Sequence, residues 1–376
     1  MVFRLTMIER FPRQKKYNIM DKTNVPAGSK GRELYASALA NLIEKRLQKN
    51  CIGYQFVISY KENVADIRSW GHARLSHDAP ARTMSILDQY NIASVAKPIT
   101  GAALLKLLSK DPNVNRDSKI LPYLPSHWDP DKSVEAITFR HLLKHTSGFR
   151  TGFHLYADLK SMVEQGVEKR DFGHHHYDNS NYNLMRLIIP KLAGYAIADI
   201  PKGIPDHERI AKEKTQASAF ANDYMDYVQK KLFNKIELPL LYCKPIEHNP
   251  ALIYDFPLTV QHGTPGEDYT LLCGSGGWTM STAQLSTFFR ALHHTEKMMP
   301  LSISNLMITE DLCYETGTTP KGVTYYEKAG VYNIGILRLN SVIVGFGNGI
   351  IVTVIVNSNS PDLEATVRAA FDEWYQ

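Results

Sequence analysis

Segments with the composition of β-strands lie near both ends of this 376-residue chain, and segments with helical patterns lie between them. Near the start, residues 53–60 and 64–73 are rich in strand-forming side chains and are separated by a polar turn. Near the end, residues 323–328, 332–339 and 350–356 have the same character. The simplest arrangement is one sheet built from both ends of the chain. We therefore expect an α/β (α+β) fold with an inserted, mainly helical domain.

Apolar side chains recur at helical spacing in further segments, which we expect to be α-helices. These helices are predicted at residues 32–49, 94–108, 181–189, 216–232, 279–292 and 363–375. The polar stretch 201–213 is predicted to be a loop. The predicted domains are an N-terminal extension (1–30), a sheet domain (31–111 and 266–376) and an inserted, mainly helical domain (112–265).

The charge of the chain does not indicate a nucleic-acid partner. Lys and Arg total 43 and Asp and Glu total 38, so the net charge is +5, and it is spread along the chain. The clearest basic cluster falls within residues 4–16, where a solvated tail is the simplest interpretation. Residues 1–20 lack the apolar core of a signal peptide, and no apolar run reaches the roughly 18 residues of a membrane helix. We therefore expect a cytoplasmic protein with neither a nucleic-acid nor a membrane partner.

No pattern in the sequence indicates a metal or a cofactor. The four cysteines, at positions 51, 243, 273 and 313, have no C-x-x-C spacing and suggest neither a zinc site nor a disulfide framework. The three histidines at 174–176 are consecutive, and consecutive side chains of an extended segment point to alternate faces, so they are poorly placed to share one ion. A loop is the favoured interpretation of this run. We therefore expect no metal and no cofactor.

Ser94 and Lys97 form an S-x-x-K motif at a predicted helix start, which Pro98 also places near Ser94. Residues three apart lie on the same face of a helix, so the serine Oγ can meet the lysine Nζ. A serine in the first turn has a backbone N–H that is free to hold an oxyanion. The positive end of the helix dipole disfavours an ammonium there and favours a neutral lysine that accepts a proton. Taken alone, the tetrapeptide is more often a surface lysine beside a capping serine.

Four further segments favour a catalytic role for the S-x-x-K motif over a surface lysine beside a capping serine. They are residues 137–149 (ITFRHLLKHTSGF), 177–182 (YDNSNY), 276–282 (GGWTMST) and 328–330 (KAG). With S-x-x-K, their order and spacing resemble the serine β-lactamase-like family, which includes class C β-lactamases, penicillin-binding proteins, D-aminopeptidases and related esterases and acyltransferases. The resemblance covers about residues 50–359. It implies a β-lactamase/transpeptidase-like fold, with an antiparallel sheet flanked by helices.

The resemblance also implies roles for the matching side chains. Ser94 would be the nucleophile that forms an acyl-enzyme, and Lys97 and Tyr177 would share the proton transfers. A tyrosine normally titrates near 10, so a Tyr177 phenolate would need the nearby cations Lys97 and Lys328. The resemblance favours Tyr177 as the general base, or as a relay with Lys97, and the sequence does not divide the proton transfers between them. Asn179 would orient the Lys97 amine or a substrate carbonyl. Lys328 would hold an anionic substrate group or tune Tyr177.

The oxyanion hole would consist of the backbone N–H groups of Ser94 and Val331. The candidates for lining the substrate site are Ala329, Gly330, His176 and Trp278. Ala329 replaces the usual Thr and removes a hydroxyl, which lowers the expectation of efficient β-lactam hydrolysis or D-Ala-D-Ala chemistry. Trp278 is bulkier than the usual Leu and would narrow a pocket. Asp178 adds a negative charge where Ser or Ala is commoner.

These features predict a serine-nucleophile hydrolase that acts through an acyl-enzyme on a carboxylic ester or small amide, with a small-molecule acyl substrate. An acyltransferase or peptidase acting on a biosynthetic intermediate through the same Ser-Lys-Tyr site is one alternative. A catalytically silent scaffold of the same fold is another. Against the scaffold, all five side chains that carry the chemistry are present.

Overall fold

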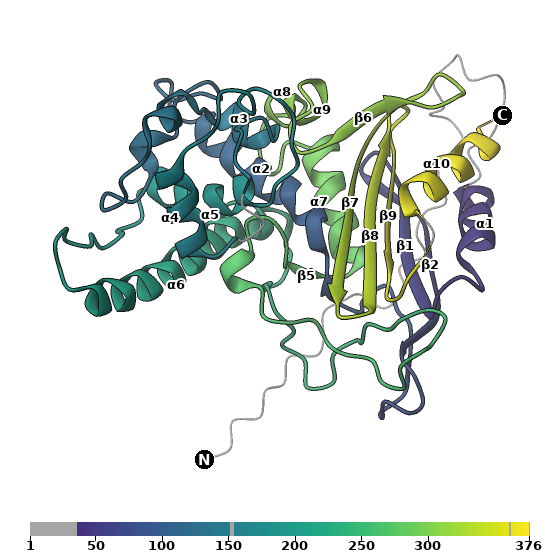
Figure 1. Cartoon of the computed structure of the whole chain (residues 1–376). Coiled ribbons are helices and arrows are strands. Elements are labelled where there is room, and N and C mark those ends of the chain that lie inside the picture. The colour runs from purple at the N-terminus through teal and green to yellow at the C-terminus, as the bar shows by residue number, and fades with distance from the viewer. Residues whose placement is uncertain (1–35, 151–153, 361, 376) are drawn as a thin grey trace.

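The computed structural model describes residues 36–150, 154–360 and 362–375. A twisted sheet with two helices on its outer face lies beside a larger group of helices (Figure 1). This arrangement confirms the predicted α/β (α+β) fold with an antiparallel sheet. The predicted N-terminal extension and its basic cluster lie outside the described residues. None of the described helices combines the length and apolar character that crossing a bilayer requires.

Within the described residues, seven strands form one sheet in the order β3-β2-β1-β9-β8-β7-β6. Their bounds are β1 (Gly53–Tyr60), β2 (Asn63–Arg74), β3 (Arg82–Thr83), β6 (Glu315–Thr318), β7 (Thr324–Ile334), β8 (Leu337–Phe346) and β9 (Ile350–Val356). The two ends of the chain meet where β1 pairs with β9, from Tyr54 opposite Val356 to Tyr60 opposite Ile350. The sheet is therefore continuous only when both ends are present.

The hairpin formed by β7 and β8 differs from the prediction. Residues 332–339 were expected to form one strand, but β7 ends at Ile334 and β8 begins at Leu337. Between them lies a two-residue turn in which Gly335 has φ +59°. The turn escaped the sequence pattern because apolar side chains continue on both sides of a single glycine.

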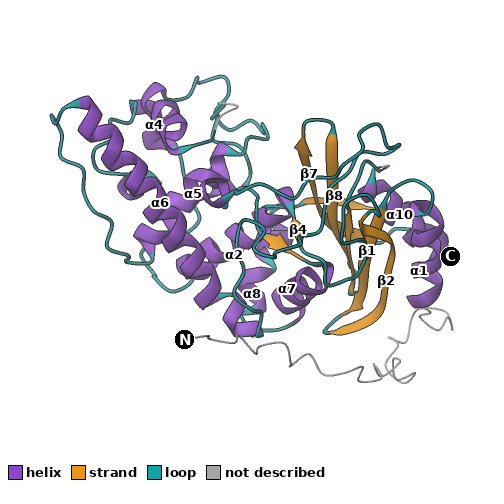
Figure 2. Cartoon of the chain, turned by 90° about the horizontal axis from the view of Figure 1, so that it is seen from below, coloured by secondary structure: helices purple, strands orange, loops and turns teal. Residues whose placement is uncertain are grey.

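Helices cover both faces of the sheet (Figure 2). On the outer face, α1 (Ala36–Leu47) packs on β1 and β2, α10 (Leu363–Trp374) packs on β7 and β8, and the two helices contact each other. The ring of Phe371 in α10 stacks on that of Phe346 in β8, with centroids 3.7 Å apart. On the inner face, α7 (Thr282–His294) packs against β1 and β9. The helix predicted at 279–292 therefore begins later, because β5 (Thr279–Met280) precedes it and Ser281 caps its N-terminus.

The remaining helices form the layer beside the sheet. They are α2 (Lys97–Leu108), α3 (Phe139–Leu143), α4 (Tyr156–Gln165), α5 (Ser180–Leu192), α6 (Asp206–Lys231), α8 (Leu301–Ser304) and α9 (Leu306–Thr309). A short pair joins β4 (Tyr90–Asn91) to β5. Almost every residue of α2 is buried, because the helix lies between the sheet domain and α5 and α6.

The start of α6 corrects the loop predicted at 201–213. The helix already begins at Asp206, and its first turns are stabilised by ion pairs rather than by an apolar face. Arg209 lies 2.8 Å from Asp206 and 3.3 Å from Glu213, and Lys212 lies 3.6 Å from Glu208. Helix turns of this kind lack the apolar spacing on which the helix prediction for residues 216–232 was based, so the sequence pattern did not reveal them.

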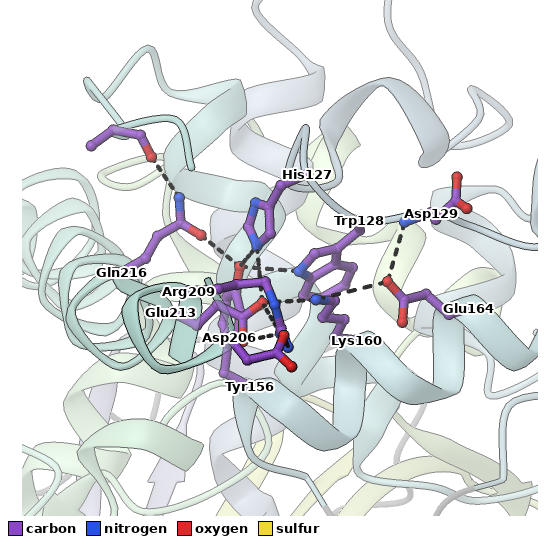
Figure 3. A network of polar contacts seen from close by, with 11 residues as sticks. His127, Trp128, Asp129, Tyr156, Lys160, Glu164, Asp206, Arg209, Glu213 and Gln216 are labelled. Atoms are coloured by element: carbon purple, nitrogen blue, oxygen red, sulfur yellow. Dashed lines mark hydrogen bonds and ion pairs between the residues drawn. The ribbon is translucent and has the colours of Figure 1, made fainter. Parts of the chain in front are cut away.

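A network of polar contacts joins α4 to α6 (Figure 3). The Tyr156 hydroxyl accepts a hydrogen bond from Trp128 Nε1 at 3.1 Å and donates one to Gln216 Oε1 at 2.5 Å. Beside it, Lys160 of α4 donates to Glu213 of α6 at 2.8 Å. These contacts fix the two helices against each other at some distance from the sheet.

Candidate active site

The backbone around Ser94 forms a tight turn. A 3₁₀ turn (Ala93–Ala96) leads directly into α2, so the helical segment begins where the sequence predicted it. Ala93 has φ +47°, a conformation that is rare for a residue with a side chain, and its N–H donates to Asn91 Oδ1 at 2.8 Å. Strained backbone of this kind is concentrated at functional sites.

The Lys97 amine lies at the centre of a hydrogen-bond cluster. Its Nζ is 2.9 Å from Ser94 Oγ, 2.7 Å from Asn179 Oδ1 and 2.9 Å from the Ser275 carbonyl oxygen. The two carbonyl oxygens can only accept hydrogen bonds, so they take two N–H groups of the amine. In a neutral amine the remaining position is a lone pair, which then faces the Ser94 hydroxyl.

Burial favours that neutral form. Lys97 is fully buried. Burial, reinforced by the positive charge of Lys328, holds the pKa of the Lys97 ammonium well below its usual value. Lys97 thus combines the position and the protonation state of a base for Ser94.

Tyr177 contacts the same hydroxyl from the other side. Its oxygen is 2.7 Å from Ser94 Oγ, and the Nζ atoms of Lys97 and Lys328 lie 4.8 and 4.9 Å from its ring centroid. Although Tyr177 is 41% exposed, burial around its hydroxyl raises its pKa to about 12. The hydrogen bond from Ser94 lowers this pKa, while the charges of Glu315 and Asp178 raise it further.

This result corrects one expectation about the tyrosine. The two lysines flank its ring as predicted, but they do not bring its pKa toward neutrality. Desolvation outweighs their charge, and Lys97 carries little charge when its own ammonium is disfavoured. Tyr177 is therefore a protonated hydroxyl near pH 7.

The turn before α5 places Asn179 and Tyr177 together. The Asp178 carboxylate accepts a hydrogen bond from the backbone N–H of Ser180 at 2.8 Å, and the Asp178 N–H donates to His145 Nδ1 at 3.2 Å. The His145 ring packs on Tyr177, with centroids 4.6 Å apart. Burial lowers the pKa of His145 to about 2, so a neutral imidazole supports the tyrosine.

Lys328 enters the site from β7 and has a partner that the sequence did not reveal. Its side chain is only 7% exposed, and its Nζ lies 3.5 Å from Oε1 of Glu315 on the neighbouring strand β6. No motif marks Glu315, because its place beside Lys328 results from the pairing of β6 with β7. The segment that contains β6 was not predicted to be a strand.

Because Gly330 has no side chain, β7 can lie close to the 3₁₀ turn that carries Ser94, here called the serine turn. A Cβ at this position would lie 2.9 Å from the Ser94 backbone nitrogen and 2.8 Å from the Ile92 carbonyl oxygen. The pairing with β6 ends at Glu327, so in the described residues the stretch of β7 from Lys328 onward faces the serine turn instead of a strand. Val331 follows Gly330 on this edge and is 45% exposed.

Two of the predicted substrate-lining residues lie elsewhere. Trp278 is completely buried, and its ring packs 5.0 Å from that of Phe233, so it belongs to the core. Ala329 packs against the apolar side chains between the sheet and α1 and α10, here called the outer-face cluster. Side chains alternate along β7, so Ala329 points to the outer face while Lys328 points to the inner face. The backbone N–H of the half-buried His176 donates to the His145 carbonyl at 2.8 Å, and its side chain stays a predicted lining residue.

Comparisons with known proteins agree with this arrangement. Residues 39–202 match the family model described as Beta-lactamase. The resemblance to the serine β-lactamase-like family is confirmed. Over 149 residues the chain is 27% identical to penicillin-binding protein 4* of Bacillus subtilis (strain 168). That match covers 36% of this chain and only 31% of the relative's length.

Solved structures share the β-lactamase-like fold over most of the chain. One is a β-lactamase/D-alanine carboxypeptidase from Pseudomonas syringae, with a TM-score of 0.67, 15% identity, and coverage of 90% of this chain and 98% of that one. Another is a D-amino acid amidase from Ochrobactrum anthropi, with a TM-score of 0.64, 16% identity, and coverage of 90% and 96%. At these identities the likeness concerns the fold.

The site contains no obvious place for a metal. In the described parts of the chain, no group of three or more His, Cys, Asp or Glu side chains is arranged to hold an ion. All four cysteines are buried free thiols. The polar groups around Ser94 are instead two amines, a phenol and an amide.

Proposed function

We propose that the chain is a serine-nucleophile hydrolase that acts through an acyl-enzyme on a carboxylic ester or small amide. The observation that carries this proposal is the buried Lys97 amine, which lies 2.9 Å from Ser94 Oγ, contacts two carbonyl acceptors and has a lowered pKa. A nucleophile in contact with a neutral base is the minimal requirement for acyl transfer at a serine. Asn179 supplies one of the two acceptors and so orients the amine.

In the acylation step, Ser94 Oγ bonds to the substrate carbonyl carbon while its proton passes to Lys97. The electron pair of the carbonyl moves to oxygen, and the backbone N–H groups of Ser94 and Val331 stabilise this oxyanion. The carbonyl then re-forms as the bond to the leaving group breaks. The leaving alkoxide or amine takes the proton from the Lys97 ammonium, either directly or through the Tyr177 hydroxyl, which gives up its own proton and receives that of Lys97, so the neutral amine is restored.

In the second step, water replaces the leaving group. Lys97 removes a proton from the water as its oxygen bonds to the acyl carbon, and the same proton returns to Ser94 Oγ when the ester bond breaks. The product acid leaves and the site is regenerated. An amine or alcohol in place of water would make the reaction an acyl transfer.

The names of the fold relatives support chemistry of this class, since they include a carboxypeptidase and an amidase. They do not favour one acyl group over another. The choice of an ester or small amide therefore remains part of the proposal, and so does the choice of water over another acceptor.

The proposal is tested by incubating the chain with a fluorophosphonate and measuring its intact mass. We expect one adduct in the wild type and none in Ser94→Ala. Short-chain nitrophenyl esters should be hydrolysed by the wild type alone. Added amines or alcohols that accelerate turnover and appear in the product would identify a transferase. Absence of both adduct and turnover would contradict the proposal and favour a scaffold.

A further inference from the structure

Glu315 places an exposed carboxylate next to the proposed acyl site. Its side chain is 73% exposed, whereas the side chain of its partner Lys328 is 7% exposed. The distance of 3.5 Å between them is long for a charge-assisted hydrogen bond, which is normally about 2.7–2.9 Å. The carboxylate is therefore held only loosely by the ammonium, and most of its side chain is open to solvent.

The charge of Glu315 is close enough to the reacting groups to act on them electrostatically. Lys328 Nζ lies 4.9 Å from the Tyr177 ring, and the Tyr177 oxygen is 2.7 Å from Ser94 Oγ. Glu315 also acts on the tyrosine directly, since its negative charge contributes to the raised pKa of Tyr177. A charged group on a substrate bound near Ser94 would thus lie within the field of this carboxylate.

Three other charged or ionisable side chains at the site bear on this effect: Lys97, Lys328 and Asp178. The Lys97 ammonium is disfavoured by burial, so Lys328 is left as the lysine that carries charge beside Tyr177. Glu315 offsets that charge. Asp178 is a second carboxylate at the site, but it is buried, accepts the Ser180 N–H and lies 3.8 Å from His154. Of these two carboxylates, Glu315 is the one exposed to solvent.

We propose that Glu315 is a specificity-determining residue that favours acyl substrates with an ammonium group over those with a carboxylate. A substrate carboxylate approaching Lys328 would have to displace Glu315 or accept its repulsion. A substrate ammonium gains an exposed carboxylate as a partner. The inference rests on the proposed acyl-enzyme chemistry at Ser94 and adds to it the charge of the acyl group.

The test uses three nitrophenyl esters of similar length, made from hexanoic acid, 6-aminohexanoic acid and adipic acid. They end in a methyl, an ammonium and a carboxylate group, and the neutral ester serves as the reference for the other two. The quantity measured is the ratio of kcat/KM for the ammonium ester to kcat/KM for the carboxylate ester. In the wild type we expect a ratio above one that falls toward one in about 0.5 M NaCl, because salt screens exposed charges.

In Glu315→Gln the ratio should fall about fivefold or more, since one exposed unit charge at about 4 Å is equivalent to roughly a factor of five in binding. Glu315→Asp keeps the charge and should retain the preference. The matched control is Glu208→Gln, which removes a similarly exposed glutamate paired with a lysine on α6, far from the sheet (Figure 1). That variant should leave all three rates unchanged.

Two outcomes separate the inference from the proposed function. If Ser94-dependent hydrolysis of the neutral ester is found but the ratio is insensitive to salt and to Glu315→Gln, the specificity inference is wrong and the acyl chemistry stands. If the wild type hydrolyses none of the esters and no fluorophosphonate adduct forms, both fail together.

Discussion

The Ser94 hydroxyl has two neighbours that could take its proton, and burial distinguishes between them. The same desolvation that disfavours an ammonium at Lys97 also disfavours a phenolate at Tyr177. The lowered pKa favours the amine as the base, whereas the raised pKa favours the phenol as a proton donor. The sequence could supply both residues but not this division, because desolvation depends on what surrounds each group in the fold.

The pH dependence of acylation follows from this difference. A base works when deprotonated, so kcat/KM should fall as the pH drops through the depressed pKa of Lys97, well below the ordinary lysine value. Tyr177→Phe should lower kcat/KM and keep this limb of the profile. Lys97→Ala should lose about 10²- to 10⁴-fold in the labelling rate of Ser94 by a fluorophosphonate. If Tyr177→Phe abolishes the limb and Lys97→Ala retains it, the assignment is reversed.

Gly330 offers a second prediction for a single residue. In Gly330→Ala the new Cβ would collide with the Ser94 backbone nitrogen and the Ile92 carbonyl, so β7 or the serine turn must shift. We expect a loss of about 1–3 kcal/mol of unfolding free energy in urea, together with a lower kcat on a nitrophenyl ester. Gly266→Ala is the control, because its Cβ would meet only ordinary contacts at 3.6 Å or more. Equal effects of the two variants would contradict the steric argument.

At the level of elements, the sequence was most informative where apolar periodicity is strong. The strand predicted at 350–356 and the helix at 363–375 agree with β9 and α10 to within a residue. The first turns of α6 were missed because ion pairs replace an apolar face there. The position of Glu315 was missed for a related reason, since its place beside Lys328 comes from the pairing of two strands. The motifs pointed to Lys328, Tyr177 and Asn179, and the structure brings these side chains together near Lys97 and Ser94.

The hydrogen-bond network between α4 and α6 gives a prediction at this scale (Figure 3). Tyr156→Phe leaves the Trp128 N–H and the Gln216 oxygen without their buried partner, so it should cost about 1–3 kcal/mol in unfolding free energy. The matched control is Tyr227→Phe. Within the described residues the buried Tyr227 hydroxyl has no hydrogen-bond partner, so its removal should be neutral or stabilising in the same urea titration. A larger loss of unfolding free energy in Tyr227→Phe than in Tyr156→Phe would show that the network does not stabilise the packing of α4 against α6.

For the whole molecule, the decisive feature is a sheet that draws strands from both ends of the chain. The outer-face cluster mixes side chains of α1 and β1 with those of β8, β9 and α10. The two ends should therefore unfold together rather than separately. The order of motifs along the sequence already implied this topology, but only the register of β1 with β9 specifies which residues join the two halves.

This coupling can be tested far from the site. Phe371→Ala removes a fully buried ring that stacks on Phe346, and it should cost about 3–5 kcal/mol. Because the cluster is shared, amides of β1 should lose hydrogen-exchange protection along with those of α10. Ala369→Ser, an exposed position on the same helix, should leave both unchanged. Loss of protection confined to α10 would contradict the coupling.

The pairing of β1 with β9 also has a consequence for synthesis of the chain. A ribosome produces Ser94 and Lys97 well before β9, which ends at Val356, about 260 residues after Lys97. Until β9 has emerged, the β1–β2 hairpin presents one unpaired edge to the surrounding solution. The helices of the middle region can form before β6 to β9 have been synthesised and the sheet is complete. Ser94 is therefore synthesised long before β7, the strand that carries Lys328, can pack against it.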